Sequence, residues 1–337
     1  MQQPISTALL AYGMSGKIFH APFIDAHPGF EFRGVLERNQ KKAHLDYPGV
    51  SSHDNLNSLL NDKELELIIV NTPNNTHFEY AKHALLAGKH VLIEKPAATS
   101  VAQVRELFDL GKKLNKKVLI YQNRRWSSDF MAARELIQSG KLGQIIEAHF
   151  RFDRYRSEIG PKFFKEEPIP GSGILYDLGA HMLDQVISIF GKPLSFHKSL
   201  GNYRKNTQVP DYAHVQLEYP GPLHVFVTVS LLVAAPTEGI VIHGTQGSFL
   251  KKFCDTQEDQ LLAGMKPLDI GFGQEKPGME GLLTLMKGDL EKEQLQISSK
   301  KGDFMGLFES VYQCIKHDTP FPVGEAEILA QLEILEA

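Results

Sequence analysis

Cysteine is scarce in this chain, which has only Cys254 and Cys314 among 337 residues. Two cysteines cannot form a disulfide framework or a cysteine metal cluster, so we expect two small buried thiols. An excess of basic charge is also missing, because the net charge is −4, and this argues against nucleic acid as a partner. No apolar run approaches the roughly 20 residues of a membrane span. Residues 1–10 lack a basic segment followed by a long apolar core, so we expect a cytoplasmic protein without a membrane partner.

The first third of the chain alternates short apolar runs with helix-like segments. The runs, each typical of a strand buried on both faces of a parallel sheet, cover residues 5–10, 32–36, 65–70, 90–93 and 118–121. Helices are predicted at 78–86 and 101–114. Thr76 followed by Glu79 has the form of a capping box, and Gly88 suits the end of the same helix. The alternation predicts an α/β fold that begins with a doubly wound parallel sheet, a Rossmann domain over residues 1–121.

The remainder of the chain, residues 122–337, has a different pattern. Strand candidates separated by Gly, Pro and polar turns follow one another at residues 144–154, 212–219, 223–231, 239–242 and 248–253. Such consecutive strands predict an open, antiparallel sheet. Helices are expected at 176–190 and 326–335, and residues 264–281 are expected to form a long loop.

A glycine-rich loop follows the first predicted strand. The dinucleotide fingerprint asks for three glycines; here Gly13 and Gly16 fill two positions and Ala11 replaces the first. The helix that follows directs unpaired N–H groups toward phosphates. Glu37, 21 residues after Gly16, stands where an acidic side chain meets the adenosine ribose, or it is a surface carboxylate. Arg38 beside it suits a 2′-phosphate instead.

Two further groups have the residue types of an active site. Lys95 follows a buried strand, where ligands bind in such sheets, and its ammonium can stabilise an alkoxide; an exposed turn lysine is the alternative. Asp177, His181 and Asp184 have the i, i+4, i+7 spacing of one helical face. A histidine between carboxylates suits proton transfer, although a solvated face has the same pattern. Three ligands on one helix are poorly placed around zinc, so we expect no metal.

These sites, taken together and in this order, resemble the glucose–fructose oxidoreductase / inositol dehydrogenase (Gfo/Idh/MocA) family along essentially the whole chain. The matching stretches are residues 11–16, Phe19-His20-Ala21-Pro22, Asn71-Thr72-Pro73-Asn74 with His77, Glu94-Lys95-Pro96, Gln122-Asn123-Arg124-Arg125-Trp126, and Tyr176-Asp177-Leu178-Gly179 with His181, Asp184 and Gln185. Two of them, Phe-His-Ala-Pro and Asn-Arg-Arg-Trp, are similar to the branch that contains scyllo-inositol dehydrogenases.

The resemblance implies a Rossmann domain, then an α/β domain with an open, mostly antiparallel sheet for substrate binding and oligomerisation as a homodimer or homotetramer. It implies that the nicotinamide lies between the domains, and that Lys95, Asp177 and His181 act on the substrate carbinol. The residues expected to bind the cofactor are Gly13, Met14, Ser15, Gly16, Glu37, Arg38, Thr72, Asn74, His77, Glu94, Lys95 and Asn123. Arg124, Trp126 and Tyr155 are weaker candidates for substrate contacts, with packing as the alternative for Trp126.

We therefore expect an NAD(P)-dependent dehydrogenase that moves a hydride between nicotinamide and a secondary hydroxyl of a sugar, inositol or related polyol. The cofactor is NAD or NADP, and the position of Glu37 favours NAD slightly. Rival hypotheses are a non-catalytic dinucleotide sensor or corepressor on the same fold, and a lyase or hydrolase that uses the cofactor without net redox change.

Overall fold

The computed structural model describes residues 3–254, 256–288 and 290–337 and divides into two compact units. The first unit contains residues 1–123, 258–272 and 304–329, and the second contains 124–257, 273–303 and 330–337. The first stretch ends two residues after the predicted boundary at 121, and two later segments join it. Met1 and Gln2, at the start of the predicted first domain, lie outside the described residues.

The first unit is built on the predicted parallel sheet. Its six strands lie in the order β3-β2-β1-β4-β5-β6 and every pair is parallel. The strands are β1 Ile5–Leu9, β2 Phe30–Leu36, β3 Ser51–His53, β4 Leu67–Val70, β5 His90–Glu94 and β6 Val118–Tyr121. Strands β1 and β4 are buried along their whole length, as predicted for a sheet covered on both faces. The short polar strand β3 was not predicted.

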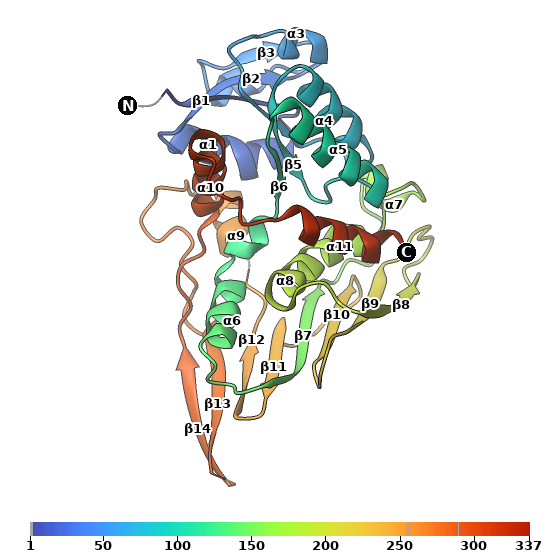
Figure 1. Cartoon of the computed structure of the whole chain (residues 1–337), viewed down its shortest axis with the longest axis vertical. Helices are drawn as coiled ribbons and strands as arrows, with labels where there is room; N and C mark the ends of the chain where they lie inside the picture. The colour runs from blue at the N-terminus through green and yellow to red at the C-terminus, as the bar shows by residue number, and fades with distance from the viewer. Residues whose placement is uncertain (1–2, 255, 289) are drawn as a thin grey trace. The chain divides into compact units, whose positions relative to one another are not determined.

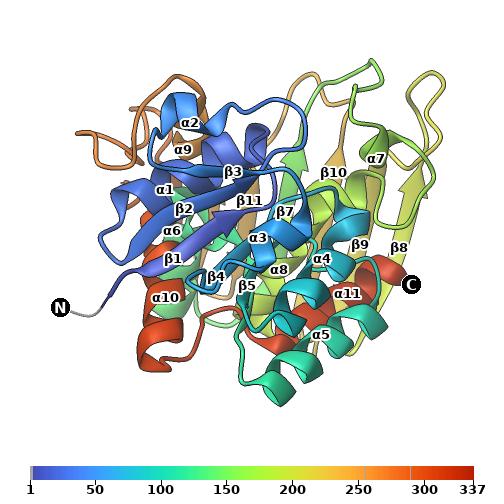
Figure 2. The same ribbon diagram turned by 90° about the horizontal axis from the view of Figure 1, so that it is seen from above.

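Helices cover both faces of this sheet (Figures 1 and 2). The bounds are α1 Ala21–Ala26, α2 Ala43–Asp46, α3 Leu56–Leu60, α4 His77–Leu86, α5 Val101–Leu114, α9 Thr256–Leu262 and α10 Phe304–His317. Helix α10 lies against α1, where Phe308 stacks on Phe23. Helix α4 follows Thr76, as predicted, and Gly88 beyond its end has φ +77°. The capping box is absent, because the Thr76 hydroxyl donates to the carbonyl of Pro73.

The second unit contains an eight-stranded sheet in the order β14-β13-β12-β11-β7-β10-β9-β8. Its strands are β7 Ile145–Asp153, β8 Ser195–Gly201, β9 Tyr212–Glu218, β10 His224–Ser230, β11 Ile240–Gly244, β12 Gly247–Lys251, β13 Gly281–Lys287 and β14 Glu291–Ile297. Only the pair β7–β10 is parallel among the described strand pairs, so the predicted, mostly antiparallel sheet is confirmed. The remaining helices are α6 Ser128–Gln138, α7 Phe163–Glu166, α8 Ala180–Phe190 and α11 Glu325–Glu336.

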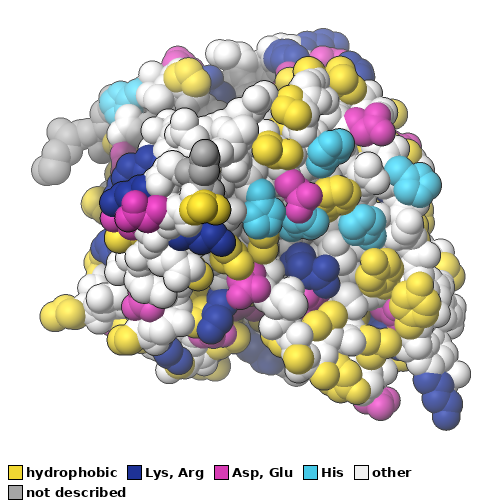
Figure 3. Space-filling model, turned by 90° about the horizontal axis from the view of Figure 1, so that it is seen from below, with side chains coloured by type: hydrophobic (Ala, Val, Ile, Leu, Met, Phe, Trp, Pro, Cys, Tyr) yellow, Lys and Arg dark blue, Asp and Glu magenta, His cyan; other side chains and the backbone are white. Residues whose placement is uncertain are grey.

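The two faces of this sheet differ. Helices α6 and α8 pack on one face, where alternate β7 residues such as Phe150 and Phe152 are buried. On the other face His149 stacks on Phe226 with 4.7 Å between ring centroids, and His214 stacks on the same ring at 5.8 Å. Figure 3 shows histidine side chains gathered among hydrophobic ones on one side of the molecule. Aromatic and hydrophobic side chains here remain partly exposed.

The described residues bear on two composition-based expectations. Cys254 and Cys314 are both free and buried, which confirms the predicted thiols. No helix within the described ranges combines the length and the apolar character needed to cross a membrane.

Candidate functional site

The glycine-rich loop between β1 and the next helical turn is held by Asn71. The Asn71 side chain accepts hydrogen bonds from the N–H groups of Leu10 and Ala11 at 3.1 and 3.0 Å and donates to the Ala11 carbonyl at 2.8 Å. These three bonds close the first turn, although Ala11 stands at the first glycine position. Spacing within the chain does not point to Asn71, because the residues that it contacts are 60 and 61 positions away.

The two glycines of the loop meet different surroundings. A Cβ on Gly16 would lie 2.2 Å from the Ala11 carbonyl oxygen, so a larger residue cannot fit without a backbone shift. A Cβ on Gly13 would meet nothing within 4 Å. Gly16 therefore permits the close packing of the loop, and Gly13 leaves its backbone open to a ligand. This is the division of roles that a pyrophosphate-binding loop needs, and the residues present fit a dinucleotide.

The carboxylate of Glu94 joins this loop to the end of β5. Ser15 donates its hydroxyl to Glu94 Oε1 at 2.6 Å, and the Nε2–H of the fully buried His20 donates to the same atom at 2.9 Å. Burial by itself raises the pKa of Glu94, but the bonds from His20 and Ser15 outweigh it and lower the pKa to about 2. Glu94 is thus an anion at neutral pH, and Lys95 follows directly after the strand, as predicted.

His77 ties together the segments that follow β4 and β5. It is fully buried, and its Nδ1 and Nε2 lie 2.7 and 2.8 Å from the carbonyl oxygens of Pro96 and Thr72. Burial lowers the pKa of this imidazole. These contacts give His77 a positioning role for the two segments, and its contact with the cofactor stays a prediction.

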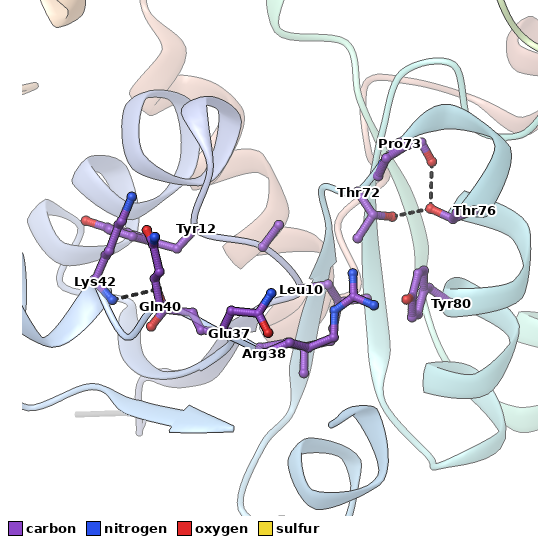
Figure 4. A pocket seen from close by; sticks show the side chains of 13 residues that line it. Leu10, Tyr12, Glu37, Arg38, Gln40, Lys42, Thr72, Pro73, Thr76 and Tyr80 are labelled. Atoms are coloured by element: carbon purple, nitrogen blue, oxygen red, sulfur yellow. Dashed lines mark hydrogen bonds between the residues drawn. The ribbon is translucent and has the colours of Figure 1, made fainter. Parts of the chain in front are cut away.

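A cavity of about 500 Å³ opens at the carboxyl ends of β1, β2 and β4 (Figure 4). Its lining residues are Leu10, Ala11, Tyr12, Leu36, Glu37, Arg38, Asn39, Gln40, Lys42, Thr72, Pro73, Thr76 and Tyr80. On one wall the Thr76 hydroxyl donates to Pro73 O at 2.6 Å and lies 2.7 Å from the Thr72 hydroxyl. Thr76 has a single proton, so Thr72 is the donor in that second bond. The predicted residues Glu37, Arg38 and Thr72 thus lie together, whereas Met14 is exposed in the loop and Asn74 begins the short helix Asn74–Thr76.

In the second unit, the segment that carries Asp177 and His181 is not one regular helix. It starts as a π-helix, Leu175–Gly179, and continues as α8 from Ala180. The prediction of a single helix over 176–190 is corrected at its first turn. A π turn within a helix is frequent at functional sites. Lys165 donates to Asp177 at 2.5 Å, and His181 is buried within α8.

Asp184, the third member of the predicted group, has a different partner. Arg125 Nε and Nη2 donate to its two carboxylate oxygens at 2.8 and 2.6 Å, and both side chains are buried. Gln185, next along α8, donates to the Arg124 carbonyl at 3.0 Å. These bonds fasten α8, and with it His181, to the turn Asn123–Trp126. Reasoning from helical spacing missed Arg125, because its partner is 59 residues away in the chain.

The weaker candidates for substrate contacts differ in exposure. Arg124 is buried, and its guanidinium carbon lies 4.8 and 5.3 Å from the ring centroids of Phe152 and Phe253. Trp126 is half-buried, and the neighbouring Asn123, which is expected on the cofactor side, is buried. Tyr155 is 62% exposed. Arg124 thus packs on two aromatic rings, Tyr155 has a side chain open to solvent, and their contacts with substrate stay predictions.

Two family models match the chain. Residues 5–122 match an oxidoreductase family with an NAD-binding Rossmann fold, and residues 130–250 match the GFO/IDH/MocA C-terminal domain. Together they cover most of the chain. The matched ranges separate the dinucleotide-binding sheet from the open sheet, as the two units of the structure do.

Curated proteins and solved structures agree with these models. The chain is 37% identical to the uncharacterized oxidoreductase C115.03 of Schizosaccharomyces pombe, across 99% of this chain and 96% of that one. It is 32% identical to the scyllo-inositol 2-dehydrogenase (NADP⁺) IolW of Bacillus subtilis, across 99% and 92%. The solved structure of the oxidoreductase YvaA of Bacillus subtilis superimposes with a TM-score of 0.94 at 31% identity, across 99% and 96%. The chain therefore belongs to the Gfo/Idh/MocA family of NAD(P)-binding oxidoreductases, as the sequence motifs predicted.

Proposed function

We propose that this protein oxidises a secondary hydroxyl of a sugar, an inositol or a related polyol, or reduces the corresponding ketone. The observation that carries the proposal is the similarity, over nearly the whole of both chains, to a relative named scyllo-inositol 2-dehydrogenase. The chain also has Lys95, Asp177 and His181 in the motifs that the family resemblance assigns to the carbinol. When bound, the nicotinamide supplies the hydride acceptor or donor.

The roles proposed for the side chains follow from their chemistry. His181 takes the hydroxyl proton as general base, which contributes roughly 10²–10⁴-fold. The Lys95 ammonium stabilises the alkoxide. Asp177 orients one of these two groups, and Lys165 holds the Asp177 carboxylate through their 2.5 Å contact. Arg125 and Asp184 keep α8 in place, so they support His181 without touching substrate.

A screen of cyclic polyols and aldoses with both oxidised cofactors tests the proposal. We expect at least one compound with a secondary ring hydroxyl to give steady formation of reduced nicotinamide, which is measured by its absorbance. A lyase or hydrolase would convert substrate with no net change in that absorbance. Cofactor binding without turnover on any polyol, aldose or corresponding ketone would favour a dinucleotide sensor and overturn the proposal.

We also propose that the open face of the eight-stranded sheet joins two copies of this chain into a homodimer, from which a tetramer can be built. Its apolar and aromatic side chains are partly exposed, and large exposed apolar patches are rare on monomers. Burial, followed by the nearby charges of Arg151, His149 and His197, lowers the pKa of His214 on this face. A second copy would bury the face further and favour neutral imidazoles more strongly.

The dimer is therefore expected to weaken in acid. The pKa of His214 is already lowered in a single copy, and a dimer would lower it further, so the separated copies bind the proton more readily. The stabilisation of the dimer is therefore complete above this lowered pKa and is lost as the pH falls through it. Sedimentation should give a dimer or tetramer at pH 8 and smaller species at pH 5.5. The substitution His214→Phe should reduce this pH dependence. The control His83→Ala, at an exposed position on α4, should leave it unchanged. A monomer at pH 8 and micromolar concentration would contradict the proposed interface.

A further inference from the structure

The cavity in Figure 4 has one acidic lining residue, Glu37, and its carboxylate is already hydrogen-bonded to other groups of the protein. Glu37 is buried, and its Oε1 accepts the backbone N–H of Lys42 at 2.9 Å. Its Oε2 accepts the Ser52 hydroxyl at 2.7 Å, and both oxygens lie 3.3 Å from the N–H of Ala43. The carboxylate thus fixes the start of α2 and ties it to β3. A ribose would have to compete with these donors for the same oxygens.

The cavity also has two basic residues. Arg38 and Lys42 line it and are exposed. Among the residues that the structure describes, neither forms an ion pair within 4 Å, whereas the neighbouring Lys17 and Lys41 are paired with Asp46 and Asp54. Figure 4 shows the Arg38 side chain extending across the cavity toward Tyr80. The cavity thus combines two free cations with an anion that is already bonded.

Asn39 and Gln40, between the two cations in the chain, also line the cavity. Their amide groups add neutral hydrogen-bond donors to the same rim. The other acidic residue close by, Asp46, accepts the Tyr12 hydroxyl and the Lys17 ammonium, both at 2.8 Å. Its charge is therefore balanced by Lys17, and the rim of the cavity is left with an unbalanced positive charge.

We propose that this rim binds the 2′-phosphate of NADP, with Arg38 as the principal contact and Lys42 as the second cation. The adenosine half of a dinucleotide lies beyond the end of the second strand in this fold, where Arg38 stands. A guanidinium can donate two parallel hydrogen bonds to a phosphate, and such charged bonds are the strong ones. The inference rests on the dinucleotide binding of the family and is independent of which hydroxyl compound is oxidised.

A preference for NAD would require the Glu37 carboxylate to face the ribose hydroxyls. In the structure its oxygens face the backbone of α2 and the hydroxyl of Ser52. The feature that remains available to a ligand is the positive charge of Arg38 and Lys42, which a phosphate dianion satisfies and a ribose hydroxyl does not.

Calorimetric titration of the full chain with two nucleotide fragments tests the proposal. Adenosine 2′,5′-bisphosphate and 5′-AMP differ only in the 2′-phosphate, so their affinity ratio isolates its contribution. We expect the bisphosphate to bind at least about tenfold more tightly. Arg38→Ala should lower its affinity about 10- to 100-fold, and Lys42→Ala should lower it less, while 5′-AMP stays within threefold. NADP and NAD should show the same order, and the preference should shrink as salt is added.

Arg33→Ala is the matched control, because Arg33 lies on β2, the strand that precedes Arg38, but is paired with Asp62 and Glu64 and does not line the cavity. It should leave the ratio unchanged. Equal or tighter binding of 5′-AMP by the unaltered chain would overturn the proposal, as would an unchanged ratio in Arg38→Ala or binding of neither fragment. A clear bisphosphate preference without polyol oxidation would overturn the proposed substrate class alone and leave the phosphate site standing.

Discussion

Replacing His181 or Lys95 with alanine is expected to lower turnover by about two to four orders of magnitude. The first substitution removes the proposed base for the hydroxyl proton, and the second removes the cation that stabilises the alkoxide. Neither residue lines the adenosine cavity. NADP affinity should therefore stay within a few fold, so that the loss falls on kcat. Steady-state kinetics on a substrate from the polyol screen, together with calorimetric titration of the cofactor, separates these two quantities.

Matched variants guard against a loss that comes from misfolding. His181 is buried, so His181→Gln, which keeps a polar side chain of similar size, should be as inactive as His181→Ala while retaining the unaltered thermal midpoint more closely. His83 on α4 and Lys113 on α5 are exposed, and their alanine variants should keep full activity. Activity within threefold of the unaltered protein in either Lys95→Ala or His181→Ala would mean that the chemistry belongs to other residues.

The strands that could be predicted are those whose burial requires a run of apolar residues in the sequence. The strand β4, Leu67–Val70, is apolar throughout because both faces are covered. The strand β14, Glu291–Ile297, was not predicted, since five of its seven residues are exposed and its sequence is mostly polar. The strand β3 has only three residues, all of them polar and none of them buried. These two strands form because they pair with a neighbouring strand, and the local amino-acid pattern does not predict that pairing.

In the candidate site, too, spacing in the sequence predicts which residues are present but not which partners their side chains contact. Spacing identified Gly13 and Gly16, because a tight turn and close packing demand glycine at fixed intervals. Spacing also found Glu37 at the end of β2, but it could not show that the N–H groups of α2 and the Ser52 hydroxyl would claim the carboxylate. Which of several possible donors a carboxylate meets depends on how the loop folds back.

Asp184 illustrates a further reason why spacing was not enough. His181 and Asp184 are three positions apart, a spacing that places two residues on one helical face. The Asp184 carboxylate is instead taken by Arg125, which lies in a turn far away in the chain. A buried ion pair of this kind is a tertiary feature, and it turns a predicted participant in proton transfer into an anchor for the helix that carries His181.

Breaking this buried pair is expected to have the largest effect on stability. Asp184→Ala leaves the Arg125 charge buried without its carboxylate, which typically lowers the free energy of unfolding by about 3–5 kcal/mol. Both side chains are nearly inaccessible, at 4% and 3% exposure, so water can compensate little. Because α8 is then held less firmly, polyol turnover should fall as well, while the fragment affinities of the nucleotide cavity should not change.

Chemical denaturation, followed by a spectroscopic signal from the second unit, measures the loss in the free energy of unfolding. Two further variants test whether the broken ion pair is its cause. The exposed pair Lys192–Glu333 belongs to the same unit, and Lys192→Ala should change the free energy of unfolding by no more than about 1 kcal/mol. Replacing both partners with apolar residues of similar volume, as in Arg125→Met with Asp184→Leu, should recover most of the lost stability, because the uncompensated charge is gone. That recovery would appear as a large coupling energy in the double-mutant cycle. Additive losses in the cycle, or a single variant within about 1 kcal/mol of the unaltered chain, would show that the pair does not hold α8 in place.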